Sequence, residues 1–179
     1  MNANAKPASD AGSLPWYGLR VRSKHEQIAA TVLRSKGYEP FLPAYKVRRR
    51  WTDRIKEMEA PLFPGYVFCR LDCSNRLPVL SATGVVGIVG IGKTPAPIEE
   101  HEIEALRAVI ESGLPSQPWP FIHQGDRVRV EHGPLRGVEG IVTSVENQQR
   151  LVVSVSLLQR SIAVAMDSAW VAALGAGKP

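Results

Sequence analysis

The residues that could carry catalytic or metal chemistry are few and scattered along the chain. The two cysteines, Cys69 and Cys73, have no second cluster of Cys or His nearby that would complete a tetrahedral metal site, so we interpret them as free thiols of a reducing cytoplasm. The four histidines are far apart in the sequence, without a nucleophile or metal-ligand spacing around them, and no Gly-rich phosphate loop follows a predicted strand. We therefore expect a protein that is not an enzyme and that needs no metal or cofactor.

A strongly basic segment is the clearest candidate for binding chemistry. Residues 46–56 read KVRRRWTDRIK and carry six Lys or Arg side chains around Trp51. The formal net charge of +5 and the pI of about 9.5 also favour an anionic partner such as nucleic acid. Charge alone leaves two interpretations open, phosphate contact or a solubilising hairpin surface. Trp51 fits either stacking on a base or packing of the hairpin.

Aromatic side chains gather around a turn in the middle of the chain. The segment PLFPGYVF, residues 61–68, places Phe63, Tyr66 and Phe68 beside a Pro-Gly turn. Judged by residue type alone, these are core aromatics, because large apolar rings are usually buried.

Periodicity predicts that helices pack on one mainly antiparallel sheet in the first half of the chain. Ser23 and Glu26 have the spacing of a capping box, in which each side chain satisfies a free backbone N–H, so a helix is expected to begin there. The elements expected in this half are a strand over 16–22, a helix from Ser23 to Gly37, strands over 38–42, 66–71 and 84–90, a weakly helical stretch at 76–83, and a helix that ends at Gly113.

The second half changes character after a segment rich in proline and glycine. Residues 114–124 are expected to form a flexible interdomain linker between a first domain over 14–113 and a second over 125–175. The second domain contains four short β-rich runs separated by turns, which predict a small all-β barrel. Residues 1–13 are polar and are expected to form a disordered tail. No apolar run approaches the roughly 18 residues that a membrane helix needs, so we expect no membrane partner.

The motifs and their order resemble the NusG family. The pattern GDRVRVEHGPLRGVEGIV, residues 125–142, resembles the KOW module, and a WY strand, a basic arm, FPGYV, GVVGIVG, TPAPI and this module follow one another over residues 16–174 as they do in that family. The resemblance implies an α+β fold: an N-terminal NGN domain, which is an α/β sandwich with a mainly antiparallel sheet, a Pro-rich linker, and a small SH3-like KOW barrel. It also implies a monomeric, cytoplasmic transcription elongation and antitermination factor.

The same resemblance assigns partners to three groups of residues. The NGN domain binds the clamp helices of the largest subunit of RNA polymerase, through a pocket formed here by Trp16, Tyr17, Phe63, Pro64, Gly65 and Tyr66. The basic arm faces the non-template DNA strand, with phosphate contacts from Arg48, Arg49, Arg50, Arg54 and Lys56, and base stacking from Trp51. The KOW barrel recruits ribosomal protein S10 or the termination factor Rho, through Leu157, Leu158 and Arg160.

The KOW residues also carry hints about the subtype. If Leu157 and Leu158 lie on one strand they must face opposite ways, so at least one is expected to be an exposed docking residue. The family usually has a bulky aromatic and a glycine where this chain has Leu158 and Gln159, which disfavours Rho contact more than S10 contact. Several segments, LLQRS among them, resemble specialised paralogues of the RfaH and UpxY types. The alternative interpretation is a ribosome-associated, RNA-binding KOW protein.

Overall fold

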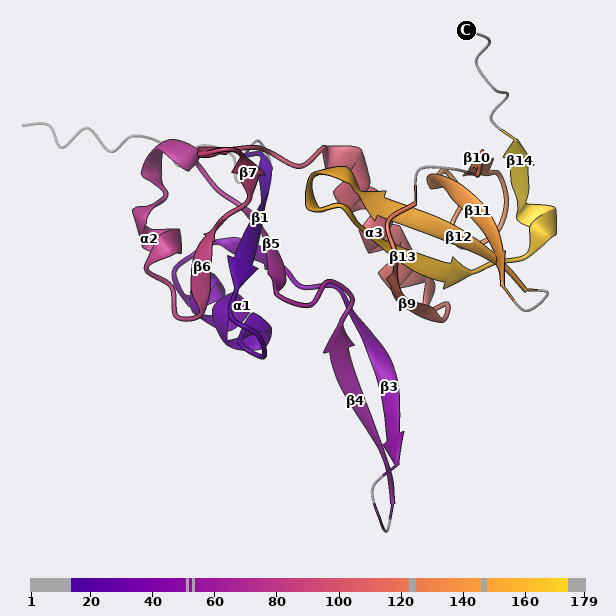
Figure 1. Ribbon diagram of the computed structural model, residues 1–179, viewed down its shortest axis with the longest axis horizontal. Helices are drawn as coiled ribbons and strands as arrows, with labels where there is room; N and C mark the ends of the chain where they lie inside the picture. Colours follow the sequence, from indigo (N-terminus) through magenta and orange to yellow (C-terminus); the bar gives the residue numbers. More distant parts are fainter. Residues whose placement is uncertain (1–13, 51, 53, 123–124, 146–147, 174–179) are drawn as a thin grey trace, which may run out of the picture.

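An antiparallel four-stranded sheet in the order β2–β5–β1–β6 organises the N-terminal half of the protein (Figure 1). The structure is a computed structural model that describes residues 14–50, 52, 54–122, 125–145 and 148–173, so the expected tail over residues 1–13 lies outside it. The elements of this half are β1 (Trp16–Val21), α1 (Glu26–Ser35), β2 (Glu39–Phe41), β3 (Ala44–Arg50), β4 (Ile55–Pro61), β5 (Tyr66–Arg70), a 3-10 turn (Cys73–Asn75), α2 (Leu77–Leu80), β6 (Val85–Ile88), β7 (Gly90–Ile91), β8 (Thr94–Pro95) and α3 (Glu100–Ser112).

Each face of this sheet belongs to a separate hydrophobic cluster. Side chains alternate along a strand, so Tyr17 and Leu19 of β1 share one face, which packs with apolar residues of α1 and α2. Trp16 of β1 and Phe68 of β5 lie on the opposite face, in a cluster that continues into α3 and the C-terminal half. Because both faces are covered, β1 is buried along most of its length rather than half-buried as its alternation predicted.

A turn at residues 63–66 is held by the first helix. The carboxylate of Glu26, which is only 7% exposed, accepts a hydrogen bond from the backbone N–H of Gly65 at 2.9 Å. Gly65 has φ +84°, a conformation that favours glycine, and its carbonyl accepts a hydrogen bond from Val21 N–H at 2.8 Å. The predicted capping box is therefore wrong: the helix begins at Glu26 without a side-chain cap at its N-cap residue, His25. Glu26 makes a tertiary contact instead.

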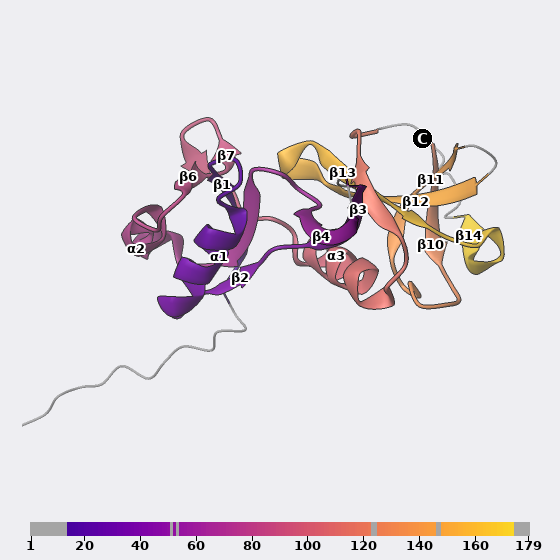
Figure 2. The same ribbon diagram turned by 90° about the horizontal axis from the view of Figure 1, so that it is seen from below.

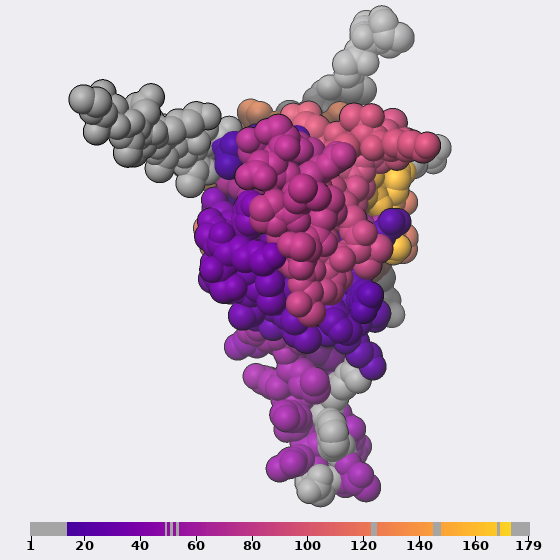
Figure 3. Space-filling view, turned by 90° about the vertical axis from the view of Figure 1, so that its left-hand side faces the viewer, coloured from indigo at the N-terminus to yellow at the C-terminus, as the bar shows by residue number. Residues whose placement is uncertain are grey.

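The strands β3 and β4 form a two-stranded arm that projects from the body (Figures 1 and 3). Their pairing runs from Ala44 opposite Pro61 to Arg50 opposite Ile55. This is the basic segment of the sequence, for which no strands were predicted; the structure shows that it forms the hairpin of β3 and β4. Trp51 lies outside the described residues, and Arg49 is described only in its backbone.

The C-terminal half is a six-stranded antiparallel sheet in the order β14–β10–β11–β12–β13–β9, here called the barrel after the predicted fold. Ser116–Trp119 of the expected linker forms β9, which pairs with β13 along the edge of the barrel. Thus part of a segment expected to lack regular structure is a strand, because an edge strand tolerates proline where no N–H is needed. The elements of this half are β9, β10 (Asp126–Val130), β11 (Glu139–Val145), β12 (Gln148–Val155), a 3-10 turn (Ser156–Leu158), β13 (Arg160–Ala165), a 3-10 turn (Ser168–Trp170) and β14 (Val171–Ala173).

The expected fold class is confirmed. The described residues form mainly antiparallel sheets with three α-helices, and the C-terminal part is rich in strands. No helix in the described ranges is long and apolar enough to cross a membrane.

The Cys69 thiol is expected to make stability fall in alkaline solution. Burial, together with the charge of Glu39, raises the pKa of Cys69 from 9.0 to about 12. Above pH 9 the unfolded chain loses this proton while the folded chain keeps it, so unfolding is favoured as the pH rises toward 12. We expect wild type to lose about 2 kcal/mol more than Cys69→Ala between pH 8 and pH 10.5, measured by urea unfolding. Equal losses in the two proteins would contradict this.

Removing the Glu26 carboxylate is expected to loosen the turn at residues 63–66. Glu26→Ala leaves the part-buried Gly65 N–H without its charged acceptor, which costs about 1.5–3 kcal/mol. Urea unfolding measures this loss, and amide hydrogen exchange at Gly65 shows whether the turn itself opens. Gln27→Ala, a truncation at the exposed neighbouring position, is the control and should change both measurements little. A Glu26→Ala protein as stable as this control would refute the assigned role.

Candidate functional site

The sheet separates residues that the sequence had grouped in one pocket. Trp16 and Tyr17 are neighbours on β1, so their side chains lie on opposite faces. Trp16 and Phe63 belong to the cluster shared with the C-terminal half, whereas Tyr17 is packed in the cluster under α1 and α2. Tyr17 therefore does not share a surface with the other aromatic residues of the predicted site.

Five aromatic side chains pack together on one side of the sheet, and this group is here called the aromatic face. Ring centroids are 6.3 Å apart for Trp16 and Phe41, 6.1 Å for Phe41 and Phe68, and 5.4 Å for Phe68 and Phe63. Tyr66, which is half-buried, packs against the same cluster. Phe41 was not among the sequence candidates, although its strand was expected over residues 38–42; only its pairing opposite Phe68 reveals that it belongs here.

Trp16 serves mainly to join this face to α3. Its indole N–H donates a hydrogen bond to Glu100 Oε1 at 3.2 Å, and its backbone carbonyl accepts one from Ile98 N–H at 2.7 Å. The guanidinium groups of Arg70 and Arg107 lie 4.7 Å and 5.1 Å from the ring centroid, as in cation–π contacts. With only 1% of its surface exposed, Trp16 shapes the site from behind.

The β-barrel packs against the N-terminal sheet beside the aromatic face in this structure. A Cβ atom placed on Gly18 would lie 3.2 Å from Leu158 Cδ2, so the barrel approaches β1 closely where no side chain intervenes. Ser156 N–H donates a hydrogen bond to Glu102 Oε1 of α3 at 3.0 Å, and α3 contacts β12. Figures 1 and 2 both show α3 beside the barrel. The two halves thus share one hydrophobic cluster, in a closed arrangement.

The predicted partner-binding residues of the barrel lie at this closed contact. Leu158 is 7% exposed, Leu157 is half-buried and Arg160 is exposed. Leu157 and Leu158 are in the 3-10 turn Ser156–Leu158 and not on a strand, so the argument from strand alternation was wrong. Gln159, which ends the turn, has φ +51°, the left-handed conformation that the family's glycine adopts easily. Leu158 is therefore a contact between the two halves of the chain in this arrangement.

The rim of the site is the turn that Glu26 holds. Pro64 is exposed and Gly65 is half-buried, while Phe63 is buried against Phe68. The sequence candidates Phe63, Pro64, Gly65 and Tyr66 thus meet at one edge of the aromatic face.

Register divides the charges of the arm into two zones. Near the body, Lys46 lies opposite Glu59 and Arg48 opposite Glu57, and Arg48 Nε forms an ion pair with Glu57 Oε1 at 3.0 Å. Toward the tip, position 49 pairs with Lys56 and Arg50 with Ile55, so acidic neighbours are replaced by cationic or apolar ones. Among the described side chains Arg50, Arg54 and Lys56 are exposed. Positive charge is therefore concentrated at the tip.

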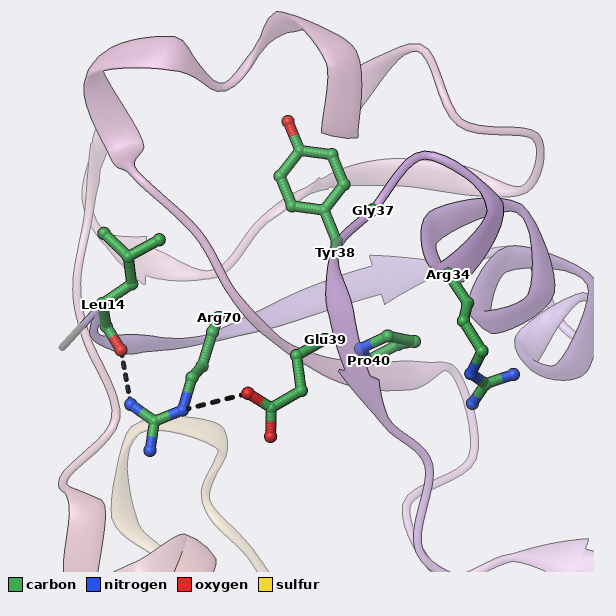
Figure 4. Close-up of a pocket in the computed structure, with 7 residues that line it drawn as sticks. All are labelled: Leu14, Arg34, Gly37, Tyr38, Glu39, Pro40 and Arg70. Atoms are coloured by element: carbon green, nitrogen blue, oxygen red, sulfur yellow. Dashed lines mark hydrogen bonds and ion pairs between the residues drawn. The ribbon is translucent and has the colours of Figure 1, made fainter. Parts of the chain in front are cut away.

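An open hollow of about 500 Å³ beside β2 is not a convincing ligand site. Its lining residues are Leu14, Arg34, Gly37, Tyr38, Glu39, Pro40 and Arg70. Figure 4 shows Arg70 directed toward Glu39 and the Leu14 carbonyl, with Arg34 on the other side of β2. Arg70 also pairs with Glu100, so its charge is already matched. Among the described residues no group of three or more His, Cys, Asp or Glu side chains could hold a metal ion.

Comparisons with known proteins agree over most of the chain. The family model described as "NusG: Transcription termination factor nusG" matches residues 14–107. The "Transcription termination/antitermination protein NusG" of Escherichia coli (strain K12) is 30% identical over 174 residues, which cover 89% of this chain and 96% of that protein. The protein of the same name from Thermus thermophilus is 27% identical, with 87% of this chain and 96% of that protein covered.

A solved structure described as "Domain interaction in Thermotoga maritima NusG" has the same fold. It is similar with a TM-score of 0.53 and 20% identity, over 92% of this chain and 99% of that chain. The family model spans more than half of the residues, and the relatives span nearly all of them. The chain therefore belongs to the NusG family, whose members are transcription factors and not enzymes.

Proposed function

We propose that the protein is a transcription elongation and antitermination factor whose aromatic face binds the clamp helices of the largest subunit of RNA polymerase. The observation that carries this proposal is a run of packed aromatic rings that shares one hydrophobic cluster with the β-barrel of the other half. Rigid aromatic side chains are favoured at protein interfaces, because they bury much apolar area at little cost in conformational entropy. The proposal includes action in the cytoplasm.

The proposed contact surface differs from the one expected from the sequence. Pro64, Gly65 and Tyr66 form its accessible edge, Phe63 is buried directly behind them, and Trp16 supports it from beneath. Tyr17 is left out, because it is packed on the other face of the sheet. Binding requires the barrel to move away, so the measured affinity for polymerase includes the free energy of opening. A polymerase that binds only the open form shifts the protein toward that form.

The barrel supplies the second half of the proposed function. Once released from the aromatic face, Leu158 becomes available together with Leu157 and Arg160 to bind ribosomal protein S10 or Rho. Because the barrel stays tethered to a polymerase-bound domain, such a partner is recruited at high effective concentration. The curated relatives named for transcription termination and antitermination span nearly the whole chain, which favours this role over that of a ribosome-associated RNA-binding protein.

The arm is proposed to contact the non-template DNA strand through its tip. Arg50 and Lys56 are exposed cations whose cross-strand partners are not acidic, and Arg54 is exposed beside them; Arg49 and Trp51 belong to the same proposed contact. Arg48 contributes less than the sequence suggested, because Glu57 already compensates its charge. The tip lies far from the barrel end of the molecule (Figure 1), so this contact does not depend on opening of the aromatic face.

Truncation of Tyr66 tests the polymerase contact. We expect Tyr66→Ala to bind RNA polymerase about tenfold more weakly than wild type and to lose its effect on pausing, because it removes the accessible ring of the proposed surface. Binding of the full chain to polymerase and the lifetime of a transcriptional pause are the measurements. Tyr38→Ala, which truncates a half-buried tyrosine of the opposite cluster, is the control. If both variants bind like wild type, the aromatic face is not the docking site.

Charge removal at the arm tip tests the DNA contact. The double variant Arg50→Ser/Arg54→Ser is expected to bind single-stranded DNA more weakly and to lower the slope of log affinity against log salt concentration by about 1.4, since each lost phosphate contact removes about 0.7. Fluorescence anisotropy with a labelled oligonucleotide measures both quantities. Lys24→Ser/Lys93→Ser removes the same charge from exposed positions off the arm. Equal losses in the two variants would mean that net charge, not the tip, binds DNA.

A further inference from the structure

The connection between the two domains is a paired strand with a very short approach. Only Leu114 and Pro115 separate Gly113, the residue that ends α3, from β9. β9 then pairs with β13 over four positions, from Ser116 opposite Val164 to Trp119 opposite Ser161. The barrel's Ala165 N–H donates a further hydrogen bond to the Pro115 carbonyl at 3.0 Å. The pairing therefore begins almost as soon as α3 ends.

The sequence of β9 suits this edge position. In an antiparallel ladder, hydrogen-bonded and non-hydrogen-bonded pairs alternate. The bond between Ala165 and Pro115 makes that pair a hydrogen-bonded one, so Gln117 opposite Ala163 is hydrogen-bonded as well. Pro118, which has no N–H, falls opposite Ile162 in a non-hydrogen-bonded pair, where none is needed.

A side-chain contact strengthens the far end of β9. The guanidinium of Arg150 on β12 lies 5.8 Å from the centroid of the Trp119 ring. Arg150 Nε is buried and has no hydrogen-bond partner among the residues that the structure describes. The ring of Trp119 therefore gives this partly desolvated cation a favourable electrostatic partner, which is lost if β9 leaves the barrel.

Pairing of β9 controls how far the barrel can move from the aromatic face. With β9 paired, the free tether is two residues and spans at most about 7 Å. With β9 detached, the tether runs from Leu114 to Gly125, and those 12 residues span about 40 Å when extended. A longer tether lowers the effective concentration of the barrel at the aromatic face and so weakens closure.

We propose that β9 is a latch: its pairing with β13 holds the barrel against α3 and the aromatic face, and the protein opens fully only when β9 detaches. The latch lies in the segment that connects the two halves, and it includes none of the residues proposed to contact polymerase, DNA or a partner of the barrel. It concerns the closure itself and does not depend on which partner binds the exposed face, so its test is independent of the proposed function.

Two backbone amides report separately on the latch and on closure. Ala165 N–H, bonded to Pro115, reports the pairing of β9, and Ser156 N–H, bonded to Glu102, reports the closed contact. Hydrogen exchange of the full chain is measured for wild type, Gln117→Pro and Ser116→Pro. Both variants add a proline to β9, but only Gln117→Pro removes an N–H that faces β13, because Ser116 lies in a non-hydrogen-bonded pair.

The latch predicts that Gln117→Pro speeds exchange at Ala165 and at Ser156 by at least tenfold, whereas Ser116→Pro changes neither by more than about twofold. Faster exchange at Ala165 alone would overturn the proposal, since the pairing of β9 with β13 would then have no effect on the closed contact. Amides of central strand β12 check that the barrel remains folded. If the β12 amides also exchange faster in Gln117→Pro, the milder variant Trp119→Ala replaces it as the test. The latch then requires faster exchange at both Ala165 and Ser156. Unchanged exchange at Ser156 overturns it.

Discussion

The close contact between the barrel and the N-terminal sheet at Gly18 is the constraint on which the rest of the structure depends. Leu158 reaches the sheet there because Gly18 carries no side chain, and Ser156 is bonded to Glu102 beside it. This contact buries apolar side chains, Leu158 among them, which favours closure by the hydrophobic effect. It also uses the barrel residue proposed to bind a second partner. A single contact between the two halves thus engages a proposed docking residue of the barrel beside the aromatic face.

The two hydrophobic clusters lie on opposite faces of the sheet, and they are suited to different tasks: one stabilises the fold and the other contains the proposed binding face. The cluster beneath α1 and α2 contains Leu19, Leu33 and Val67, all fully buried, and none of the barrel residues that the structure describes. It can therefore remain intact when the barrel moves. The other cluster crosses between the halves, so its burial changes with opening. Because the two clusters are separate, the aromatic face can be exposed while the cluster beneath α1 and α2, which positions it, stays folded.

Local sequence patterns predicted local structure well, but they failed where the structure depends on contacts between residues far apart in the sequence. Alternation and helical spacing identified the main strands and helices, since they record which faces are buried. The same alternation places Tyr17 opposite Trp16, a signal that the family resemblance overrode in the predicted site. The contact of Glu26 with Gly65 and the pairing of β9 with β13 join segments about 40 residues apart, which no short-range pattern contains. The position of Phe41 depends likewise on its pairing with Phe68.

The mainly apolar nature of the interdomain contact has a thermal consequence. Opening exposes apolar surface and so raises the heat capacity of the protein in water. The free energy of closure is therefore a curved function of temperature. Hydrophobic association weakens on cooling, because its driving force near room temperature is largely entropic. The closed form should accordingly lose population in the cold, even while the α1-covered core stays folded. A chilled cell would then hold more of the protein with its aromatic rings uncovered than a warm one.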